Sequence, residues 1–422
     1  MSSAVAVFRS RPFIRSLAPV KASERRLERR VTLAWGLLVL NVLTFAPNES
    51  ILHIPSTLGK VITQGSLSAA LLVILTVNRK LIIRPNVFLC LPSLLVIDAI
   101  LTCLETQYLR SDVYYTVRLA EFVAVLWLFT PFWGRRDLLL ARCHLKAMTV
   151  VLGSVIIGLL VDPGRSRTGG RLEGIIWPIP APQVAHYAAI TFGLVAVLWF
   201  CGYWRGRPTI FAVAVAGVVL LLTHTRTALV GLIAGLLVAG LSIIVTQARA
   251  RRMFASIGVV TAVTVLAFSG PIASWLARGQ NTQQLTGLSG RAQVWGALLA
   301  SPRNMFEEIF GFGLADSSFG GQAIDSNWLA SYQEQGLFGV TVCAAMLVFL
   351  FAAAYFQPRG VQRALALFLV AYCLAASLTE VGFTDASTYL LDLTVAASLL
   401  VPAVVNTGRY LNRSDTDGLR EE

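Results

Sequence analysis

Residues 226–246 read RTALVGLIAGLLVAGLSIIVT, an apolar run whose single charged residue stands at its first position. A helix of this length is long enough to cross a hydrocarbon core of about 30 Å. Similar runs recur along the chain and predict about twelve membrane-spanning helices. They are expected near residues 31–47, 59–77, 87–104, 115–133, 147–161, 184–203, 209–223, 226–246, 254–274, 334–356, 361–379 and 385–404.

The composition of the 422-residue chain also indicates a membrane protein. Hydrophobic residues make up 56% and charged residues only 14%, and the mean hydropathy is +0.69. Too little polar surface remains to cover an ordinary soluble globule, so that class is excluded. We therefore expect an all-α, polytopic membrane protein. No cleavable signal peptide is predicted, because the first apolar run follows a long basic tail and lacks a small-residue cleavage site.

The basic residues predict how the chain is oriented in the membrane. About 25 of the 35 lysines and arginines lie in the two tails and in alternate loops, and cytoplasmic segments retain positive charge. Both termini are therefore expected in the cytoplasm. This topology signal accounts for most of the formal net charge of +13. Membrane lipids are the expected partner of the basic tail, and no nucleic-acid partner is expected because the usual binding motifs are absent.

The predicted organisation has five parts. They are a basic cytoplasmic tail (1–30), a bundle of about nine spans (31–274), an extracytoplasmic loop with a short amphipathic helix (275–333), the last spans (334–404) and a cytoplasmic tail (405–422). The long loop is rich in glycine, arginine and carboxylate, so chemistry on a water-borne or headgroup substrate is expected there. The six cysteines have no metal-ligand spacing and are interpreted as packing residues.

Several charged residues fall inside the predicted spans, on the expected outer side. They are Asp98, Arg118, Glu121 and Asp392. Burying an ion in lipid is costly, so such groups usually face a bundle interior or an aqueous cavity. A polar cavity open to the outside is therefore predicted. Arg118 and Glu121 are three positions apart and are expected to pair with each other.

Two arginines stand at predicted helix starts on the outer side. Arg226 follows Thr225 at the start of a span, and Arg291 follows Ser289 at the start of the amphipathic helix 292–300. A helix N-terminus that bears an arginine is suited to phosphate, because free N–H groups, the helix dipole and a bidentate cation act together. The two helix ends together could hold a diphosphate. Alternatively, each arginine only tethers its loop to a carboxylate or a lipid headgroup.

A third phosphate-binding candidate, Arg171, lies in a glycine-rich outer loop, residues 162–183. The grounds for Arg171 are weaker, since no helix start is predicted beside it.

These segments resemble motifs of the O-antigen ligase and O-antigen polymerase superfamily, in the same order. The resemblance covers about residues 165–345. It is carried by Thr225-Arg226-Thr227-Ala228, by Ser289-Gly290-Arg291 with Trp295, by Gly311-Phe312-Gly313, and by Asn327-Trp328-Leu329 with Glu334, Gly336 and Gly339. Arg171 with Gly174, and Pro182 with Gln183, are similar more loosely to an upstream segment of the family.

The resemblance implies an integral-membrane glycosyltransferase in cell-surface polysaccharide biosynthesis, multi-pass in the bacterial cytoplasmic (inner) membrane. Its donor would be a polyprenyl-diphosphate-linked glycan, whose diphosphate the arginines bind, and its acceptor another glycan or a lipid-linked molecule. The acceptor hydroxyl would attack the anomeric carbon at the outer face of the membrane, with inversion. No metal and no cofactor are expected in that scheme.

The resemblance also suggests a catalytic base. Ligases of the family commonly have a histidine just before the asparagine that ends the loop, whereas this chain has Asp325-Ser326-Asn327. Aspartate is more typical of polymerase-like members, which favours a polymerase over a ligase. Asp325 is then the favoured base and His224 the alternative base, with Asn327, Glu334 and Ser289 in supporting roles. The same three residues before an apolar helix could instead be an ordinary N-terminal cap.

Two other classes of membrane protein fit the same outline. Secondary transporters often have twelve spans and both termini inside, and Asp98, Glu121 and Asp392 could bind a proton or a coupling ion. A flippase for lipid-linked sugars would also present cations to a diphosphate. The longest loop lies outside, between the ninth and tenth predicted spans, and the unexplained cations gather at the outer end. Both features favour the enzyme.

Overall fold

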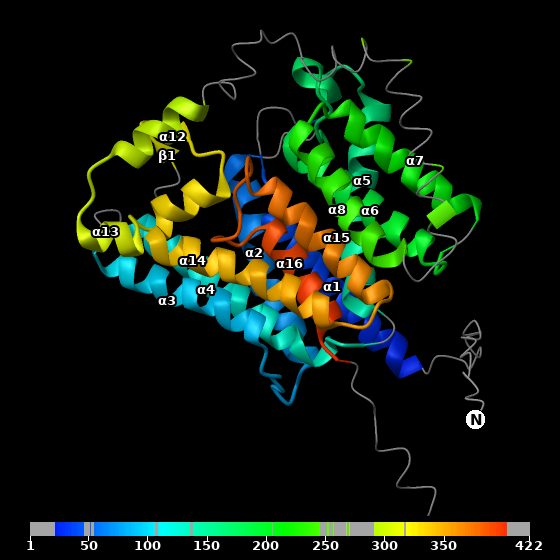
Figure 1. Ribbon diagram of the computed structural model, residues 1–422, viewed down its shortest axis with the longest axis horizontal. Helices are drawn as coiled ribbons and strands as arrows, with labels where there is room; N and C mark the ends of the chain where they lie inside the picture. Colours follow the sequence, from blue (N-terminus) through cyan, green and yellow to red (C-terminus); the bar gives the residue numbers. More distant parts are fainter. Residues whose placement is uncertain are drawn as a thin grey trace, which may run out of the picture.

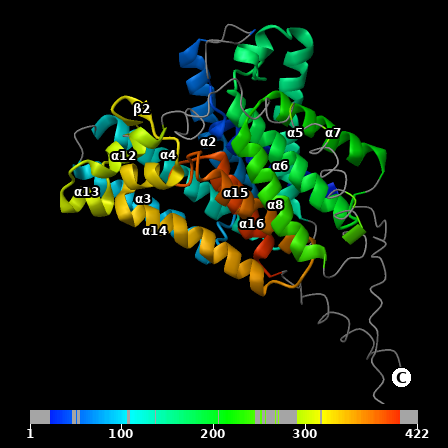
Figure 2. The ribbon, with the colours of Figure 1, turned by 45° about the horizontal axis from the view of Figure 1, so that its top comes forward.

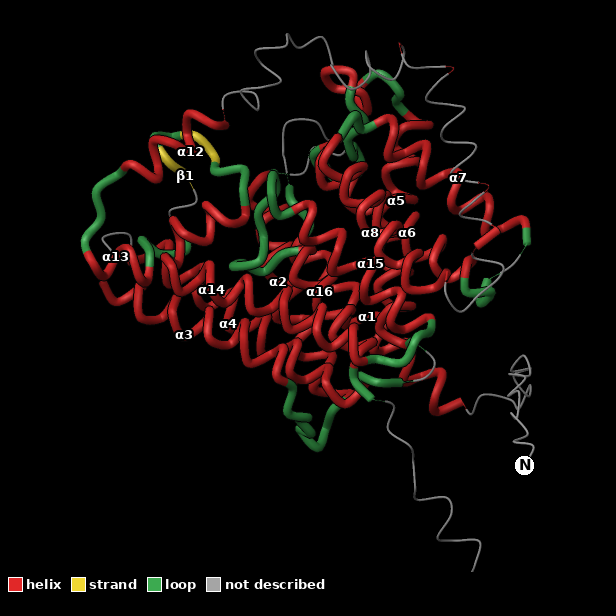
Figure 3. Tube along the Cα trace, viewed as in Figure 1, coloured by secondary structure: helices red, strands yellow, loops and turns green. Residues whose placement is uncertain are grey.

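The computed structural model describes residues 22–45, 51, 55–105, 109–135, 138–204, 206–244, 251, 252, 256, 267, 270, 291–315 and 318–402. This part of the chain is mostly helical, as predicted, with one short antiparallel hairpin of strands β1 and β2 (Figure 3). Most of the predicted span 254–274 and the first part of the predicted loop, residues 275–290 with Ser289 included, lie outside the described residues.

Each of the other predicted spans falls on a helix. The helices are α1 (Ala22–Val42), α2 (Ser56–Val77), α3 (Val87–Glu105), α4 (Leu109–Phe129), α5 (Leu139–Val161), α6 (Ala181–Phe200), α7 (Arg207–Leu222), α8 (Arg226–Ile244), α12 (Arg291–Ala300), α13 (Met305–Phe310), α14 (Asn327–Phe356), α15 (Val361–Ala376) and α16 (Thr388–Leu400). The strands are β1 (Ser318–Phe319) and β2 (Gln322–Ala323). Within the described residues, 7 helices are long and apolar enough to cross a membrane, namely α2 to α6, α8 and α14.

The outward faces of the helices are apolar. Leu72, Leu104, Phe211, Leu241 and Val348 are each more than half exposed, although they are large hydrophobic residues. Apolar surface spread over so many helices is what a lipid environment requires. The structure thus agrees with a membrane protein, while the count of twelve spans and the cytoplasmic termini stay predictions.

Helices α8 and α15 pack closely because glycines face aromatic rings between them. A Cβ added at Gly231 or Gly235 of α8 would overlap Tyr372 or Phe368 of α15. Small residues at such contacts let helices approach one another in membranes. Figures 1 and 2 show the resulting arrangement, in which α5 to α8 gather on one side, α3, α4 and α14 on the other, and α1, α2, α15 and α16 between them.

Helix α14 is broken near its start, where Gln335 and Gly336 have non-helical backbone angles. The break removes the helical donors for the carbonyls before it. The Phe312 and Gly313 amides replace them, donating to the carbonyls of Gln333 and Glu334 at 2.9 Å each. The glycine-aromatic-glycine segment and the break therefore satisfy each other's backbone groups.

Two glycines allow this contact. Gly311 has φ +79 and Gly336 has φ +60, both in the left-handed region that favours glycine. A Cβ at Gly311 would overlap the backbone at residues 334 and 335, and one at Gly336 would overlap the backbone at residues 309 and 310. The segment and the break thus interlock with no room for a side chain.

Two expectations about helix limits need correction. The fifth span was expected at residues 147–161, but α5 begins at Leu139, so Cys143 and His144 are buried within the helix. The tenth span was expected from residue 334, but α14 begins at Asn327 and passes through its break. The amphipathic helix α12 was expected at residues 292–300 and spans Arg291–Ala300, with Leu298 buried and Leu299 63% exposed.

Candidate functional site

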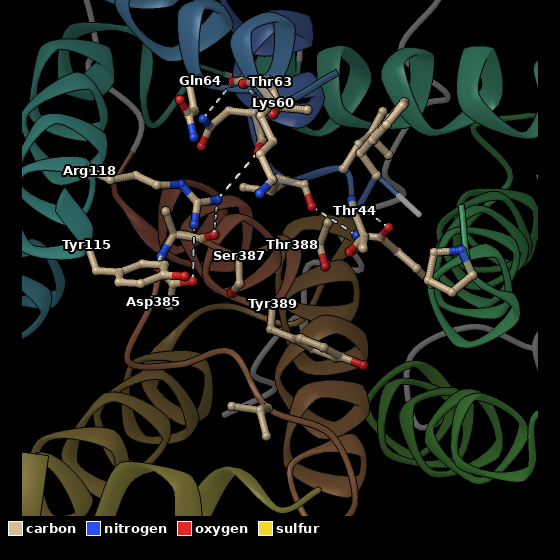
Figure 4. A pocket seen from close by; sticks show the side chains of 18 of the residues that line it. Thr44, Lys60, Thr63, Gln64, Tyr115, Arg118, Asp385, Ser387, Thr388 and Tyr389 are labelled. Carbon is tan, nitrogen blue, oxygen red and sulfur yellow. Dashed lines mark hydrogen bonds and ion pairs between the residues drawn. The ribbon is translucent and has the colours of Figure 1, made fainter. Parts of the chain in front are cut away.

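A polar cavity of about 790 Å³ lies at one end of the bundle. There α1 and α15 end and α2, α4, α6 and α16 begin. The predicted orientation would make this the outer end, where a polar cavity was expected. Its charged and aromatic lining comprises Phe45, Lys60, Tyr114, Tyr115, Arg118, His186, Glu380, Asp385 and Tyr389. Figure 4 labels Lys60, Tyr115, Arg118, Asp385 and Tyr389 among them.

Arg118 links three parts of the cavity wall. Its Nη1 lies 3.3 Å from Asp385 Oδ2, and its Nη2 donates to the carbonyls of Ala386 at 3.1 Å and Asn41 at 3.4 Å. The pairing expected with Glu121 is therefore wrong. The loop between α15 and α16 brings Asp385 to the guanidinium, while Glu121 lines a smaller adjoining cavity of about 260 Å³.

Asn327, at the start of α14, holds the loop between α15 and α16, residues 377–387. Its Oδ1 accepts hydrogen bonds from the backbone amides of Gly382 at 3.1 Å and Phe383 at 2.8 Å. The backbone N–H of Asn327 donates to the carbonyl of Ser377 at 3.0 Å. Since Asn327 is only 1% exposed, these contacts are shielded from water. We call this segment the cavity loop.

Glu334 holds the same loop from the end of the first part of α14. The Thr384 hydroxyl donates to Glu334 Oε2 at 2.8 Å, one residue before the cavity-lining Asp385. Asn327 and Glu334, for which supporting roles were predicted, thus position the loop that carries Glu380 and Asp385.

Gln183 closes the cavity wall on the other side, at the start of α6. Its amide nitrogen donates to the carbonyl of Val42 and its amide oxygen accepts from the amide of Thr44, both at 2.9 Å. The end of α1 is therefore fixed to α6 by one side chain.

Arg171 binds the turn between α7 and α8. Its Nε donates to the carbonyl of Thr223 at 3.2 Å, and its Nη2 donates to Thr225 Oγ1 at 3.2 Å. His224 lies in this turn with φ +50, a conformation rare for a residue other than glycine. The structure thus brings Arg171 and His224 to the start of α8, where Arg226 stands.

The start of α8 adjoins the cavity loop. Arg226 is the first residue of α8, and the hydroxyl of the next residue, Thr227, lies 2.7 Å from that of Thr379. Thr379 immediately precedes Glu380, which lines the cavity. Arg226 and His224 are not themselves among the lining residues.

The remaining predicted site residues lie elsewhere. Arg291 is the first residue of α12, and Figures 1 and 2 place α12 and α8 on different sides of the central helices. Asp325 lies between β2 and Ser326, the N-cap residue of α14, outside the cavity lining. The structure therefore does not bring the start of α12 to that of α8, and Asp325 is not among the residues that line the cavity.

A buried histidine and carboxylate cluster below the cavity was missed. His144 Nε2 on α5 lies 2.7 Å from Asp392 Oδ1 on α16, and His186 Nε2 on α6 lies 3.1 Å from Asp392 Oδ2. All three side chains are at most 2% exposed, and His186 also lines the cavity. The only hints in the sequence were an aspartate and histidines within or beside apolar runs.

The hydrogen bond from Trp35 assigns the tautomer of His144. The Trp35 indole donates to His144 Nδ1 at 3.2 Å, and an indole N–H can only donate. His144 must therefore carry its proton on Nε2 and donate it to Asp392. A nitrogen that holds a proton is not free to bind a metal, and no group of side chains suited to a metal ion occurs in the described part of the chain.

Comparison with known proteins adds no further assignment. The chain matches no protein-family model and no curated protein.

Proposed function

We propose that the chain is a membrane glycosyltransferase that polymerises or ligates polyprenyl-diphosphate-linked glycans at the outer face of the cytoplasmic membrane. The observation that carries the proposal is the support of the cavity loop. Asn327 and Glu334, two residues of the motif resemblance, hold the loop whose carboxylates line a polar cavity. The motif residues thus build a site rather than a lipid-facing surface.

The lining of the cavity suits a sugar. Its volume of about 790 Å³ falls within the range of about 300–1,000 Å³ common to ligand pockets. Tyr114, Tyr115 and Tyr389 offer flat apolar faces, while Gln64 and Glu380 offer hydrogen-bonding groups. Such a lining accepts both the ring faces and the hydroxyl groups of a glycan.

Basic groups near the cavity suit the diphosphate. Lys60 and Arg118 line the cavity, and Arg171 lies at the turn before α8, where Arg226 stands. In the proposed reaction the acceptor oxygen forms a bond to the anomeric carbon while the bond to the diphosphate oxygen breaks. The diphosphate leaves with the electron pair, so nearby cations lower the barrier.

The proton of the acceptor hydroxyl passes to a base. Asp325 is the proposed base and His224 the alternative. Among the described residues, Glu380 and Asp385 are the carboxylates that line the cavity. They take the role if Asp325 proves dispensable. The choice of polymerase over ligase rests on Asp325 standing where ligases of the family have histidine.

The test is the set of lipid-linked glycans that accumulate when the gene is deleted. Single repeat units on polyprenyl diphosphate are expected for a polymerase, and full-length glycans for a ligase. An unchanged set of lipid-linked glycans would contradict the proposal.

A second candidate is a secondary transporter, favoured by one observation. Asp98 is buried in α3 with no hydrogen-bond partner on either carboxyl oxygen, as at proton sites in membrane proteins. Proton-dependent solute flux in proteoliposomes, together with an unchanged set of lipid-linked glycans, would support this function instead.

A further inference from the structure

Asp98 is a carboxyl group without a partner in the interior of the protein. It lies in the second half of α3 and is 1% exposed. Neither Oδ1 nor Oδ2 forms a hydrogen bond, although buried polar groups in folded proteins nearly always do. Asp98 therefore differs from the buried Asp392, whose two carboxyl oxygens each lie beside a histidine nitrogen.

No basic side chain in the described part of the protein pairs with Asp98. Helix α3 packs mainly against α4 and α14. The titratable residues on these elements are Cys90, Cys103 and Glu105 on α3, Arg110, Asp112, Tyr114, Tyr115, Arg118 and Glu121 on α4, and Tyr332, Glu334, Cys343 and Tyr355 on α14. Arg118 pairs with Asp385 instead, and Arg110 stands at the start of α4.

The Gln335 side chain leaves an acceptor without a donor near Asp98. Gln335 is fully buried at the break of α14. Its Nε2 donates to the carbonyl of Leu95 at 2.9 Å, while its Oε1 has no partner. Leu95 precedes Asp98 by three positions, so both residues lie on the same face of α3, one turn apart.

One proton removes the charge and supplies the missing donor. A protonated Asp98 is neutral, which removes the cost of burying a charge without a partner. Its O–H is also a donor, which the unpaired Oε1 of Gln335, held one turn away by the bond to Leu95, lacks. A hard divalent cation would fit less well, because such ions take about six or more oxygen ligands. Asp98 and Gln335 together supply only three unpaired side-chain oxygens.

We propose that Asp98 is a proton-binding site, neutral at neutral pH, whose O–H donates to Gln335 at the break of α14. The site is separate from the cavity and does not depend on the proposed glycosyl transfer. Gln335 directly follows Glu334, which holds Thr384 of the cavity loop. Loss of this proton would place a negative charge beside the segment that supports that loop.

Infrared spectroscopy of the full chain in lipid nanodiscs tests the protonation. The carbonyl stretch of a protonated carboxyl is expected at pH 7, absent in Asp98→Asn and retained in Asp112→Asn. Asp112 is a matched control, because it is equally buried but accepts a hydrogen bond from the Ala315 amide at 2.8 Å. Absence of the band from the natural chain, or its persistence in Asp98→Asn, would overturn the proposal.

Three further measurements test the assignment. Gln335→Leu is expected to move the band to the position of a carboxyl without an acceptor, and an unmoved band would rule out the bond to Gln335. If Asp98→Asn does not fold, carbon-13-labelled aspartate in the natural chain must shift the band. If sodium raises the thermal stability of the natural chain but not that of Asp98→Asn, the site binds a cation rather than a proton, and the proposal is overturned.

Discussion

Asn327 shows how much of the cavity depends on a single side chain. Its side-chain Oδ1 accepts hydrogen bonds from two backbone amides of the cavity loop, while its backbone N–H donates to the Ser377 carbonyl. No apolar residue could replace it, because the two amides of the loop would be left buried without an acceptor.

We expect Asn327→Ala to destabilise the protein by about 2 kcal/mol or more, since each buried group left unpaired costs about 1–3 kcal/mol. Thermal unfolding of the purified protein measures the loss, and glycan transfer should fall with it. Ser326→Ala is the control, because the Ser326 side chain makes no capping hydrogen bond. Equal stability in both variants would show that the loop is held by other contacts.

Asp325→Asn separates a base from a helix cap. Asparagine and aspartate cap helices about equally well, but only a carboxylate accepts a proton. We expect most of the turnover to be lost while thermal stability is kept, in an assay with purified protein and lipid-linked donor. Turnover like that of the natural chain would transfer the role to His224 or to a carboxylate of the cavity loop.

Arg226→Ala should abolish transfer without reducing the amount of protein in the membrane. Lysine should rescue it poorly, because lysine lacks the bidentate fork of the guanidinium. Arg291→Ala should reduce transfer less, because α12 and α8 lie on different sides of the central helices. Arg363→Ala, near the start of α15 at the other end of the bundle, is the control and should keep activity. Full activity in the Arg226 alanine variant would exclude Arg226 from the proposed diphosphate site.

At the scale of elements, the break in α14 is the device that joins the loop segments to the bundle. Its free carbonyls bind the glycine-aromatic-glycine segment, Glu334 just before it holds the cavity loop, and Gln335 reaches α3. Residues 333–335 thus contact three separate parts of the protein: the glycine-aromatic-glycine segment, the cavity loop and α3.

Gly336→Ala should destabilise this junction by about 1–3 kcal/mol, because alanine is strained at positive φ and its Cβ would overlap the backbone at residues 309 and 310. Gly153→Ala in α5 is the control, since a Cβ there meets no atom within 4 Å. That change should be neutral or slightly stabilising. Thermal unfolding of the two variants gives the comparison, and equal effects would mean that the break can relax.

The helices could be predicted because long apolar runs have few other structures open to them in a membrane. The start of the tenth span was misplaced for a physical reason. In the sequence, Gln335 and Gly336 look like the end of a loop. In the structure a helix continues on both sides of them, and the amides of residues 312 and 313 satisfy the carbonyls at the break.

The site was less predictable, because its contacts join distant parts of the chain. His144 and Asp392 are 248 positions apart, and Arg118 and Asp385 are 267 apart. Spacing along a helix suggested Glu121 for Arg118, but local spacing says nothing about a carboxylate that another loop delivers. Asn327 and Glu334 were recognised from the family resemblance, and their role in holding the cavity loop came only from the structure.

At the scale of the whole molecule, the orientation in the membrane decides which solution the cavity meets. In a chain whose natural cysteines are replaced, a cysteine at Gln283 should react with a membrane-impermeant thiol reagent in intact cells, because positive charge predicts that loop outside. A cysteine at Arg251 should react only after the membrane is opened. The opposite pattern would reverse the orientation and move the cavity to the cytoplasmic side.

The cavity wall contains both early and late parts of the chain. Residues 41–45, at the end of α1, and residues 385–389, at the start of α16, line the same space. A ribosome must therefore have made nearly the whole polypeptide before the wall can close. During synthesis α1 is made long before α16 can pack beside it. A nascent or prematurely terminated chain therefore has no complete cavity that could bind a ligand.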